Sequence, residues 1–574
     1  MISTTAKRQR GAALLALLGV IALGASWFVV SRLNAESNLA AATRATRNTE
    51  VLTKAKQALI GYVAAQAVKA GETRPGALPC PEAGADFNNA ANEGTASYPC
   101  TLPKVGRFPW RTIGLQKLVD AHGEPLWYVV SPGWAGAGTV INSDSLGQLT
   151  VDGAANDSVA LIIAPGPAFS VPAAPGCTAW NQVRSTVAPP DWRNYLECEN
   201  ATYPTPDAIF QTRGPAGSFN DQVVRITVAE IMPAIEAAIA NRIEREIVPA
   251  LNTVITPAAW GFAGTKPMYP YAAAFASPGP GAGTSNYRGA AGTYLGLLPF
   301  NQTQGCTESA SDPRCTTATT GGTAFLVFSK PINDVQTAGS GSIRTQSNCA
   351  WQATTYVCTG EYLQPSISVT VTINVTNAAM GLRALDLSRI TCSAVDDVGA
   401  GIPEQNVPCT TSVAIQTNGA ASFTVATGPM PDIVDSGWGT YANYKISMQR
   451  AAIGDHALLD TTDATTGWFA RNEWFRLTYY AVAAGHTAAT LPPTCTTGTN
   501  CLTVANVTPA GAQRAILILG GGSMNGSARP SATLANYLEA GNATGAFTRN
   551  TVRTATAIPV AQRFNDLVIV IGSN

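Results

Sequence analysis

Charged residues are scarce in this chain of 574 residues, and no segment concentrates charge of one sign. Asp, Glu, Lys and Arg together make up 13% of the sequence, and 36 basic residues balance 36 acidic ones. Nucleic-acid binding needs a basic patch or tail, so we expect no nucleic-acid partner. The 53 glycines and 37 prolines instead indicate a loop-rich chain with much β-structure.

The motifs of common catalytic and cofactor sites are also missing. The sequence has no phosphate-binding loop, no dinucleotide glycine signature and no HExxH zinc pair. It has no Cys-x-x-Cys, and its histidines, His122, His456 and His486, are scattered. We therefore predict no enzymatic activity, no cofactor and no metal held by Cys and His.

Four short segments are weaker candidates for chemistry. Ser523 in "GGGSMNG" lacks the second glycine of a nucleophile elbow, and His122 lies in a polar turn with Gly123 and Pro125. We interpret both as turns, which leaves a secreted hydrolase as the most distant alternative. Two acidic loops offer oxygen ligands for calcium without a full ligand set: Asp152, Asn156 and Asp157, and Asp396 with Asp397.

Twelve cysteines fall into neighbouring pairs. An even number of cysteines in an exported chain predicts six disulfides that staple loops, although the sequence does not fix their connectivity. We expect each cysteine to pair with its neighbour: Cys80 with Cys100, Cys177 with Cys198, Cys306 with Cys315, Cys349 with Cys358, Cys392 with Cys409, and Cys495 with Cys501.

A long apolar run lies near the N-terminus. Three cations, Lys7, Arg8 and Arg10, precede Gly11, and residues 12–30 follow without a charge. Such a run predicts a transmembrane helix over 12–30, with the cations on the cytoplasmic side. This predicts a single-pass inner-membrane protein whose ectodomain is periplasmic or on the cell surface. The alternative is a cleaved secretory signal, but the apolar run continues beyond its small-residue site at 22–24.

Helical patterning continues beyond the apolar run. Leu52, Ala55, Leu59 and Val63 recur at three- and four-residue steps, and no proline occurs before Pro75. We therefore expect an amphipathic helix over 31–70 that continues the preceding helix. Half of the combined helix would lie in membrane lipid, and the other half would pack on a globular domain.

The basic leader, the glycine, the apolar run and the amphipathic continuation together resemble the start of type IV pilins and type II secretion pseudopilins. The resemblance covers about the first 70 residues. It implies that a prepilin peptidase removes a leader over 1–11 by cutting after Gly11, and that Ala12 becomes a methylated N-terminus. It also implies partners among other pilin or pseudopilin subunits, contacted through the N-terminal helix.

One position departs from the family pattern. Most members carry Glu at the fifth mature residue, which is Ala16 here. The absence of this Glu is similar to minor subunits at a filament tip, and it equally permits a protein that only keeps the anchor. We therefore expect a minor subunit, of the initiator or tip type, of a type IV pilus or type II secretion filament. The alternative is a membrane-anchored or secreted adhesin or binding protein outside any filament.

The ectodomain repeats itself. "NYLECENAT" at 194–202 recurs as "NYLEAGNAT" at 536–544, and "FND" follows each at 219–221 and 564–566. A buried-strand pattern precedes each copy, and a helix pattern with isoleucines at four-residue steps begins at Val228. We predict two related α+β modules, of which the second begins with a helix.

The second copy is longer, and its excess is β-patterned. "ISVTVTINVT" alternates apolar and polar residues from Ile367. The predicted fold is thus α+β, with a long N-terminal transmembrane and amphipathic helix, two related modules and a β-sandwich-like insertion in the second. The expected divisions are a first module over 71–227, a helix and module start over 228–300, the insertion over 301–465, and the remainder over 466–574.

Aromatic residues gather in a Gly- and Pro-rich stretch of the second copy. They are Trp260, Tyr269, Tyr271, Tyr287 and Tyr294. Exposed aromatics can anchor a partner protein, but core packing is the expectation that we favour.

Overall fold

A computed structural model describes most of residues 8–573. Outside the described residues lie 99, 101–103, 137, 176, 186, 202–208, 213–218, 256–268, 270, 277–286, 288–291, 300–327, 339–341, 346, 353–354, 364–366, 376–384, 396–402, 416–420, 432–440, 451–460, 488–493, 525 and 550–562. The chain divides into two compact units. Unit 1 comprises 1–65, 76–139 and 145–231, and unit 2 comprises 66–75, 140–144 and 232–574.

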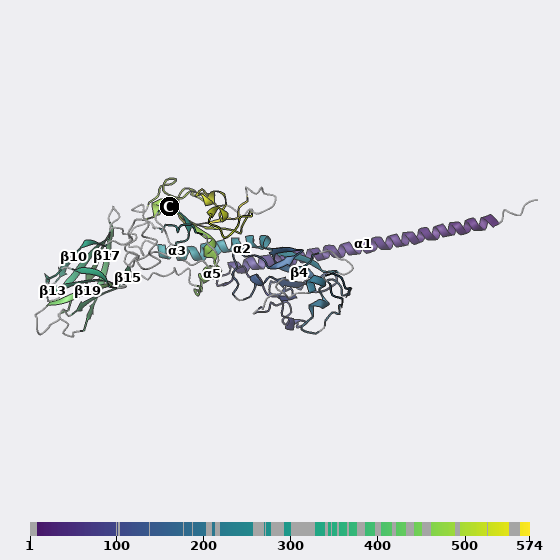
Figure 1. Cartoon of the computed structure of the whole chain (residues 1–574), viewed down its shortest axis with the longest axis horizontal. Coiled ribbons are helices and arrows are strands. Elements are labelled where there is room, and N and C mark those ends of the chain that lie inside the picture. The colour runs from purple at the N-terminus through teal and green to yellow at the C-terminus, as the bar shows by residue number, and fades with distance from the viewer. Residues whose placement is uncertain are drawn as a thin grey trace, which may run out of the picture. The chain divides into compact units, whose positions relative to one another are not determined.

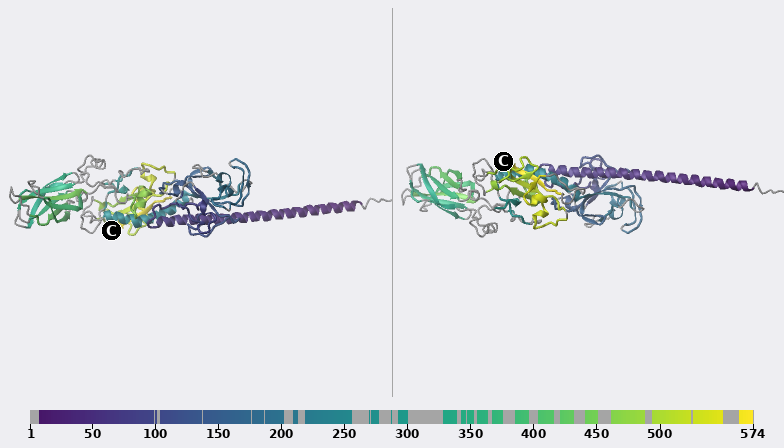
Figure 2. Two further views of the ribbon diagram at one scale, coloured as in Figure 1. Left: turned by 90° about the horizontal axis from the view of Figure 1, so that it is seen from below. Right: turned by 90° about the horizontal axis from the view of Figure 1, so that it is seen from above.

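Helix α1, Arg8–Val68, is one continuous helix of 61 residues (Figures 1 and 2). Its C-terminal part has a buried face, formed by Leu52, Ala55, Leu59 and Val63. The described side chains from Leu17 to Val30 are exposed instead. We call the part of α1 that contains Leu52 to Val63 its packed part, and the part from Leu17 to Val30 its free part.

The prediction of a transmembrane helix over 12–30 is wrong. Among the side chains that the structure describes, no helix carries an apolar stretch long enough to cross a membrane. A membrane-spanning helix needs about 20 apolar residues.

The predicted fold class and localisation both included this membrane span and are therefore also wrong. The described residues form a mixed α and β structure with many strands and four α-helices, and its N-terminal helix does not qualify as a membrane span. The predicted single-pass inner-membrane localisation depended on that span and is wrong for the same reason.

Unit 1 contains a six-stranded sheet. Its order is β1-β2-β4-β3-β7, and β8 pairs with β4. The strands are β1 Lys104–Arg107, β2 Trp127–Val130, β3 Leu149–Val151, β4 Ala154–Ala164, β7 Ile209–Phe210 and β8 Gln222–Thr227, and a separate pair is formed by β5 Ser170–Val171 and β6 Trp180–Asn181.

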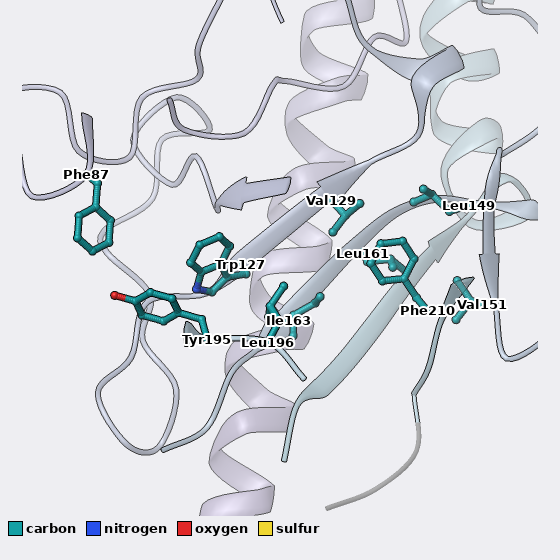
Figure 3. Packing of buried hydrophobic residues seen from close by; sticks show 10 residues of the cluster. All are labelled: Phe87, Trp127, Val129, Leu149, Val151, Leu161, Ile163, Tyr195, Leu196 and Phe210. Carbon is teal, nitrogen blue, oxygen red and sulfur yellow. The ribbon is translucent and has the colours of Figure 1, made fainter. Parts of the chain in front are cut away.

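Both faces of the central strands β2 and β4 are buried. Figure 3 shows Trp127, Val129, Leu161 and Ile163 on one face, together with Tyr195 and Phe210, and α1 crosses behind the sheet. Side chains alternate between the faces of a strand, so Tyr128 and Ile162, both fully buried, point to the side of α1. This explains why β2 and the second half of β4, residues 159–164, are continuously apolar.

Polar contacts also fix α1 to unit 1. The Lys56 Nζ atom lies 2.5 Å from Glu230 Oε1 and donates to the Arg225 carbonyl at 2.9 Å. The buried Asn48 accepts a hydrogen bond from the Ala121 amide at 2.6 Å. These contacts lie in the second half of α1, where its apolar face is covered.

Unit 2 contains a four-stranded antiparallel sheet, with the order β24-β22-β20-β9. This order corresponds to the antiparallel path β8-β4-β2-β1 in unit 1. The strands are β9 Leu295–Leu297, β20 Thr478–Val482, β22 Gln513–Leu519 and β24 Leu567–Ser573. A short parallel pair, β21 Val504–Ala505 with β23 Phe547–Thr548, corresponds to the parallel pair β3 and β7.

The helical pattern that begins at Val228 forms α2, Val228–Arg242, and α3, Val248–Ile255, joined by the π-turn η5, Ile243–Ile247. Isoleucines at four-residue steps, from Ile231 to Ile247, are all fully buried. In an α-helix each such step rotates the side chain by about 40° beyond a full turn. The wider π-turn compensates for this drift and keeps the isoleucines on one face.

The other described helices of unit 2 are short. Two of them, the α-helix α5, Gly467–Arg471, and the 3-10 helix η11, Trp474–Leu477, together bury Trp468, Phe469, Trp474 and Phe475.

The β-patterned segment forms two sheets. One has the order β10-β14-β18-β17, and the other β11-β13-β19-β15-β16 with β12 paired to β13 (Figure 1). Their strands are β10 Phe328–Ala338, β11 Ser342–Ile343, β12 Asn348–Gln352, β13 Thr355–Leu363, β14 Ser368–Val375, β15 Leu385–Val395, β16 Gln405–Val407, β17 Cys409–Ile415, β18 Ala421–Thr427 and β19 Tyr441–Arg450.

Five disulfides are present in the described residues, each between neighbouring cysteines. They are Cys80–Cys100, Cys177–Cys198, Cys349–Cys358, Cys392–Cys409 and Cys495–Cys501. The Cys392–Cys409 bond joins β15 to β17 and therefore links the two sheets of the β-patterned segment. The expected pair Cys306–Cys315 lies outside the described residues.

Candidate functional site

The two copies of the repeated motif form a buried carboxyl pair in each unit. In unit 1, Glu197 lies between the 3-10 helices η3, Trp192–Asn194, and η4, Cys198–Ala201, and Asp221 immediately precedes β8. In unit 2, Glu539 lies between η13, Leu534–Asn536, and η14, Ala540–Ala543, and Asp566 precedes β24. We call each pair a carboxyl clasp.

The unit 1 clasp is reciprocal. The Asp221 amide donates to Glu197 Oε2 at 2.9 Å, and the Glu197 amide donates to Asp221 Oδ2 at 3.1 Å. Glu197 also accepts from the Asn220 amide at 2.9 Å and from Gln182 Nε2 at 2.7 Å. Each carboxyl group therefore accepts a hydrogen bond from the backbone amide of the other residue.

The unit 2 clasp repeats these contacts. The Glu539 amide donates to Asp566 Oδ2 at 2.7 Å, and the Asn565 amide donates to Glu539 Oε2 at 3.1 Å. The Asp566 amide also donates to the Glu539 carboxylate. The same hydrogen-bonding scheme thus joins the two chain segments in both units.

An asparagine completes each clasp. Asn200 Nδ2 donates to Asp221 Oδ2 at 3.0 Å, and the Gln211 amide donates to Asn200 Oδ1 at 2.9 Å. In unit 2, Asn542 Nδ2 donates to Asp566 Oδ2 at 3.3 Å and accepts from the Thr548 amide at 2.9 Å. The asparagine therefore connects the clasp to the end of β7 in unit 1 and to β23 in unit 2.

Both clasps are buried. Burial raises the pKa of Glu197, and burial together with the neighbouring Glu197 charge raises the pKa of Asp221 well above its usual range. In unit 2, burial raises the pKa of Glu539, and burial with the Glu539 charge raises that of Asp566 in the same way. Two carboxyl groups in contact cannot both ionise readily in such a place.

An arginine lies beside each clasp. The Arg184 guanidinium lies 4.7 Å from the centre of the Tyr195 ring, and the Arg529 guanidinium lies 4.7 Å from the Tyr537 ring. Each arginine also donates to the carbonyl that follows the buried strand, that of Gly166 at 2.5 Å in one unit and that of Gly521 at 2.6 Å in the other. Arg184 pairs with Glu124 at 3.1 Å, and Arg529 pairs with Asp144 at 3.2 Å. These two acidic residues come from unrelated positions of the two copies.

A further buried carboxylate secures the turn after each buried strand. Asp120 accepts from the Gly166 amide at 2.9 Å, and Glu236 on α2 accepts from the Gly522 amide at 2.8 Å. Burial raises the pKa of Glu236 to about 7. These carboxylates are held by backbone amides, as expected of polar groups that brace a turn.

The geometry favours a structural and proton-holding role over catalysis. Glu197, Asp221 and Asp566 are almost completely buried, and their oxygens accept hydrogen bonds from amides of the protein itself. No nucleophile or histidine is among their hydrogen-bond partners in the described residues. A general acid or base must instead lie within hydrogen-bond reach of a substrate.

The weaker chemical candidates lie in turns. The exposed Ser523 donates to the Ser527 carbonyl within one turn. The exposed His122 donates its backbone amide to Asp120 Oδ1 at 2.7 Å. Neither arrangement joins a nucleophile to a base, as covalent catalysis requires.

The two acidic loops considered as a possible calcium site show no cluster of ligands in the described residues. Asp152 accepts from the Thr212 amide at 2.8 Å, whereas Asp157 lies 3.6 Å from Arg225. Asp396 and Asp397 lie outside the described residues. Another group with ligand-like spacing is Cys177, Cys198 and Glu199, but its two sulfurs are bonded to each other and provide no thiolate.

The aromatic candidates do not form one surface. Tyr269 and Tyr287 are buried, and Tyr287 packs against Phe475 with ring centres 5.4 Å apart. Tyr271 and Tyr294 contact each other edge to face at 5.8 Å, and Tyr294 is exposed. Trp260 lies outside the described residues.

The predicted processing site lies within α1. Gly11 and Ala12 have helical backbone, and their side chains lie outside the described part of the helix. Cleavage after Gly11 and methylation of Ala12 therefore stay predictions.

Sequence reasoning found the repeated motifs but missed the clasps that they form. The available signal was the retention of Glu, Asn and Asp at equivalent places of two otherwise divergent copies, with Glu197, Asn200 and Asp221 in the first. Polar residues in segments that flank buried strands are retained when they satisfy one another.

Comparison of this chain with protein-family models, with curated proteins and with solved structures gives no match.

Proposed function

We propose that this protein is a pilin-like subunit of a helical filament, of the minor type, that assembles through the free part of α1. The two units and the β-patterned segment would be displayed outside the assembled helices for binding or for contacts with sister subunits. The proposal rests first on the exposed apolar segment of α1, and then on the resemblance of the N-terminal sequence to pilins and pseudopilins.

The free part of α1 is apolar on all sides. Nine large apolar side chains are exposed by 54–74% of their surface: Leu17, Leu18, Val20, Ile21, Leu23, Trp27, Phe28, Val29 and Val30. At 100° per residue these positions are distributed around the whole circumference of the helix. A helix with one partner carries an apolar stripe, whereas a helix that is apolar all round is surrounded. This pattern supports enclosure by several helices.

The energy involved is large. Burying nine such side chains from their present exposure would contribute roughly 10 kcal/mol at about 1 kcal/mol or more each. That is comparable to the whole stability of an ordinary domain, about 5–15 kcal/mol. A segment with this much exposed apolar surface is therefore expected to associate.

The disulfides support the placement of the displayed part. Five bonds in the described residues are typical of proteins that fold in an oxidising compartment outside the cytoplasm. Filament subunits with exported ectodomains meet this condition.

The mature N-terminus tests the proposal. We expect the protein isolated from its native cells to begin at Ala12 and to carry an N-methyl group, as measured by mass spectrometry of the N-terminal peptide. A mature chain that keeps Met1, or one that begins near Ala25, would exclude the pilin-like role. The second outcome would favour the alternative of a secreted binding protein outside any filament.

A further inference from the structure

We infer that each unit is held closed by a single proton shared within its carboxyl clasp, so that the fold of both units responds to pH. The proton lies between Glu197 and Asp221 in unit 1 and between Glu539 and Asp566 in unit 2. This inference does not depend on the filament role.

The geometry requires a donor between the carboxyl groups. The Oδ1 atoms of Asp221 and Asp566 are buried and have no hydrogen-bond donor among the described residues if both carboxyl groups are ionised. Within each pair, however, the two carboxyl groups are in hydrogen-bonding contact. A proton on the aspartate supplies the missing donor and removes one of two buried negative charges.

The proton belongs on the aspartate because the glutamate oxygens are occupied as acceptors. Glu197 Oε1 accepts from Gln182 Nε2, and its Oε2 accepts from two backbone amides. Asp221 uses only Oδ2 as an acceptor, and its Oδ1 is available for the proton. In unit 2 the Glu539 carboxylate accepts from the Asn565 and Asp566 amides, Asp566 accepts through Oδ2, and Asp566 Oδ1 is available for the proton.

The charged surroundings differ between the units. In unit 1 the neighbours that face the clasp are the neutral Gln182, Asn200 and Asn220, and Arg184 reaches Gln182 at 3.3 Å while it pairs with Glu124. In unit 2 the Arg529 charge lowers the pKa of Glu539 and thereby counteracts burial, and Arg529 is itself paired with Asp144. The buried Glu236 of α2 also feels the charges of both Arg529 and Glu539.

The sign of the pH effect follows from the raised pKa values. A carboxyl group whose pKa is higher in the folded than in the unfolded state stabilises the fold while it is protonated. That stabilisation is complete below the unfolded pKa, near 4, and is lost as the pH rises through the folded pKa. We therefore expect each clasp, and the segments that it joins, including η4 and η14, to loosen as the pH rises through the raised pKa values of its carboxyl groups.

The experiment measures urea unfolding of the full chain over a range of pH. In the wild type, each clasp should increase the unfolding equilibrium constant by up to tenfold per pH unit within its titration window. Asp221→Asn and Asp566→Asn should each remove the contribution of one clasp to the pH dependence of the unfolding equilibrium constant. The reason is that the side-chain amide is a permanent hydrogen-bond donor at the position of the proton. Asp191→Asn and Asp463→Asn are matched controls, since hydrogen bonds lower the pKa of both carboxyl groups and both should keep the slope.

The reverse substitution sharpens the test. Glu197→Gln places an amide group where two oxygens must accept, so it should destabilise unit 1 at every pH, unlike Asp221→Asn. If both variants unfold alike, or if Asp221→Asn keeps the wild-type slope, the shared proton is excluded. Stabilisation of the wild type by added Ca²⁺, absent in Asp221→Asn, would also overturn it, because a cation would then bridge the pair.

A second measurement detects the proton directly. Infrared spectra of the folded wild type should show a protonated carboxyl band above the pH at which ordinary carboxyl groups ionise, and this band should be weaker in Asp221→Asn and Asp566→Asn, which leave Glu82 and Glu236 in place. Complete loss of that band in the folded protein would contradict the inference.

Discussion

At the scale of single residues, unit 2 depends on a buried ion pair at the end of α2. The completely buried Arg242 lies 2.7 Å from Glu246 and 4.3 Å from the centre of the Trp468 ring. The Trp468 indole donates to Glu246 at 2.7 Å, and Arg242 donates to the Glu72 carbonyl at 2.7 Å. This cluster joins the helix, the segment 66–75 and α5 through buried polar contacts.

Replacement of one partner of this ion pair should be costly. We expect Arg242→Met to lower the free energy of unfolding by about 3–5 kcal/mol, because it leaves the Glu246 charge buried with fewer partners. The double variant Arg242→Met/Glu246→Leu should lose less than Arg242→Met alone, since no buried charge is left. Urea unfolding measures both. Arg245→Met is the control, because the half-exposed Arg245 should contribute under about 1 kcal/mol. Equal losses in Arg242→Met and Arg245→Met would contradict this account.

At the scale of elements, α1 combines two different environments in one helix. Leu59 and Ala55 are completely buried in unit 1, whereas Leu23 and Trp27 are each 74% exposed. The backbone is the same in both parts, so the difference lies only in what covers the side chains. The packed part contributes to folding, and the free part is available for association.

Matched leucine substitutions should separate these two parts. We expect Leu59→Ala to lower the free energy of unfolding of unit 1 by roughly 2–5 kcal/mol, because it leaves a cavity. Leu23→Ala should leave that value within about 0.5 kcal/mol of the wild type, as for other exposed positions. Thermal or urea unfolding of the isolated full chain measures both. A large loss in Leu23→Ala would show that the segment 17–30 packs within its own chain.

The same helix shows what the sequence could predict. The periodic Leu52, Ala55, Leu59 and Val63 indicated the buried face, and that face is buried. The apolar run over 12–30 predicted a membrane span, but no helix among the described side chains is long and apolar enough to cross a membrane.

The carboxyl clasps, in contrast, could not be predicted from the sequence. Glu197 and Asp221 are 24 positions apart, and nothing local in either segment predicts that they meet. Hydrogen bonds of this kind depend on tertiary placement by neighbouring strands, which periodicity does not encode. Only the repetition of the motif marked these residues, and it did not distinguish a site from a turn.

At the scale of the whole molecule, each part is stabilised by its own internal contacts. Each unit has a β-sheet with a carboxyl clasp, and the β-patterned segment has two sheets linked by Cys392–Cys409. A disulfide over 17 positions stabilises by about 3 kcal/mol in the loop-entropy account. Under the proposed function such parts would be displayed, and the free part of α1 would join other chains.

The most direct test is site-specific photocrosslinking in native cells. A photoreactive residue at Leu23 or Trp27 should capture pilin-type subunits or further copies of this chain, identified by mass spectrometry. The control is the same residue at Val187, which is 69% exposed but lies on unit 1 away from α1 in sequence. The account predicts capture from α1 alone. Absence of any pilin-type partner at both α1 positions, or equal capture from Val187, would contradict it.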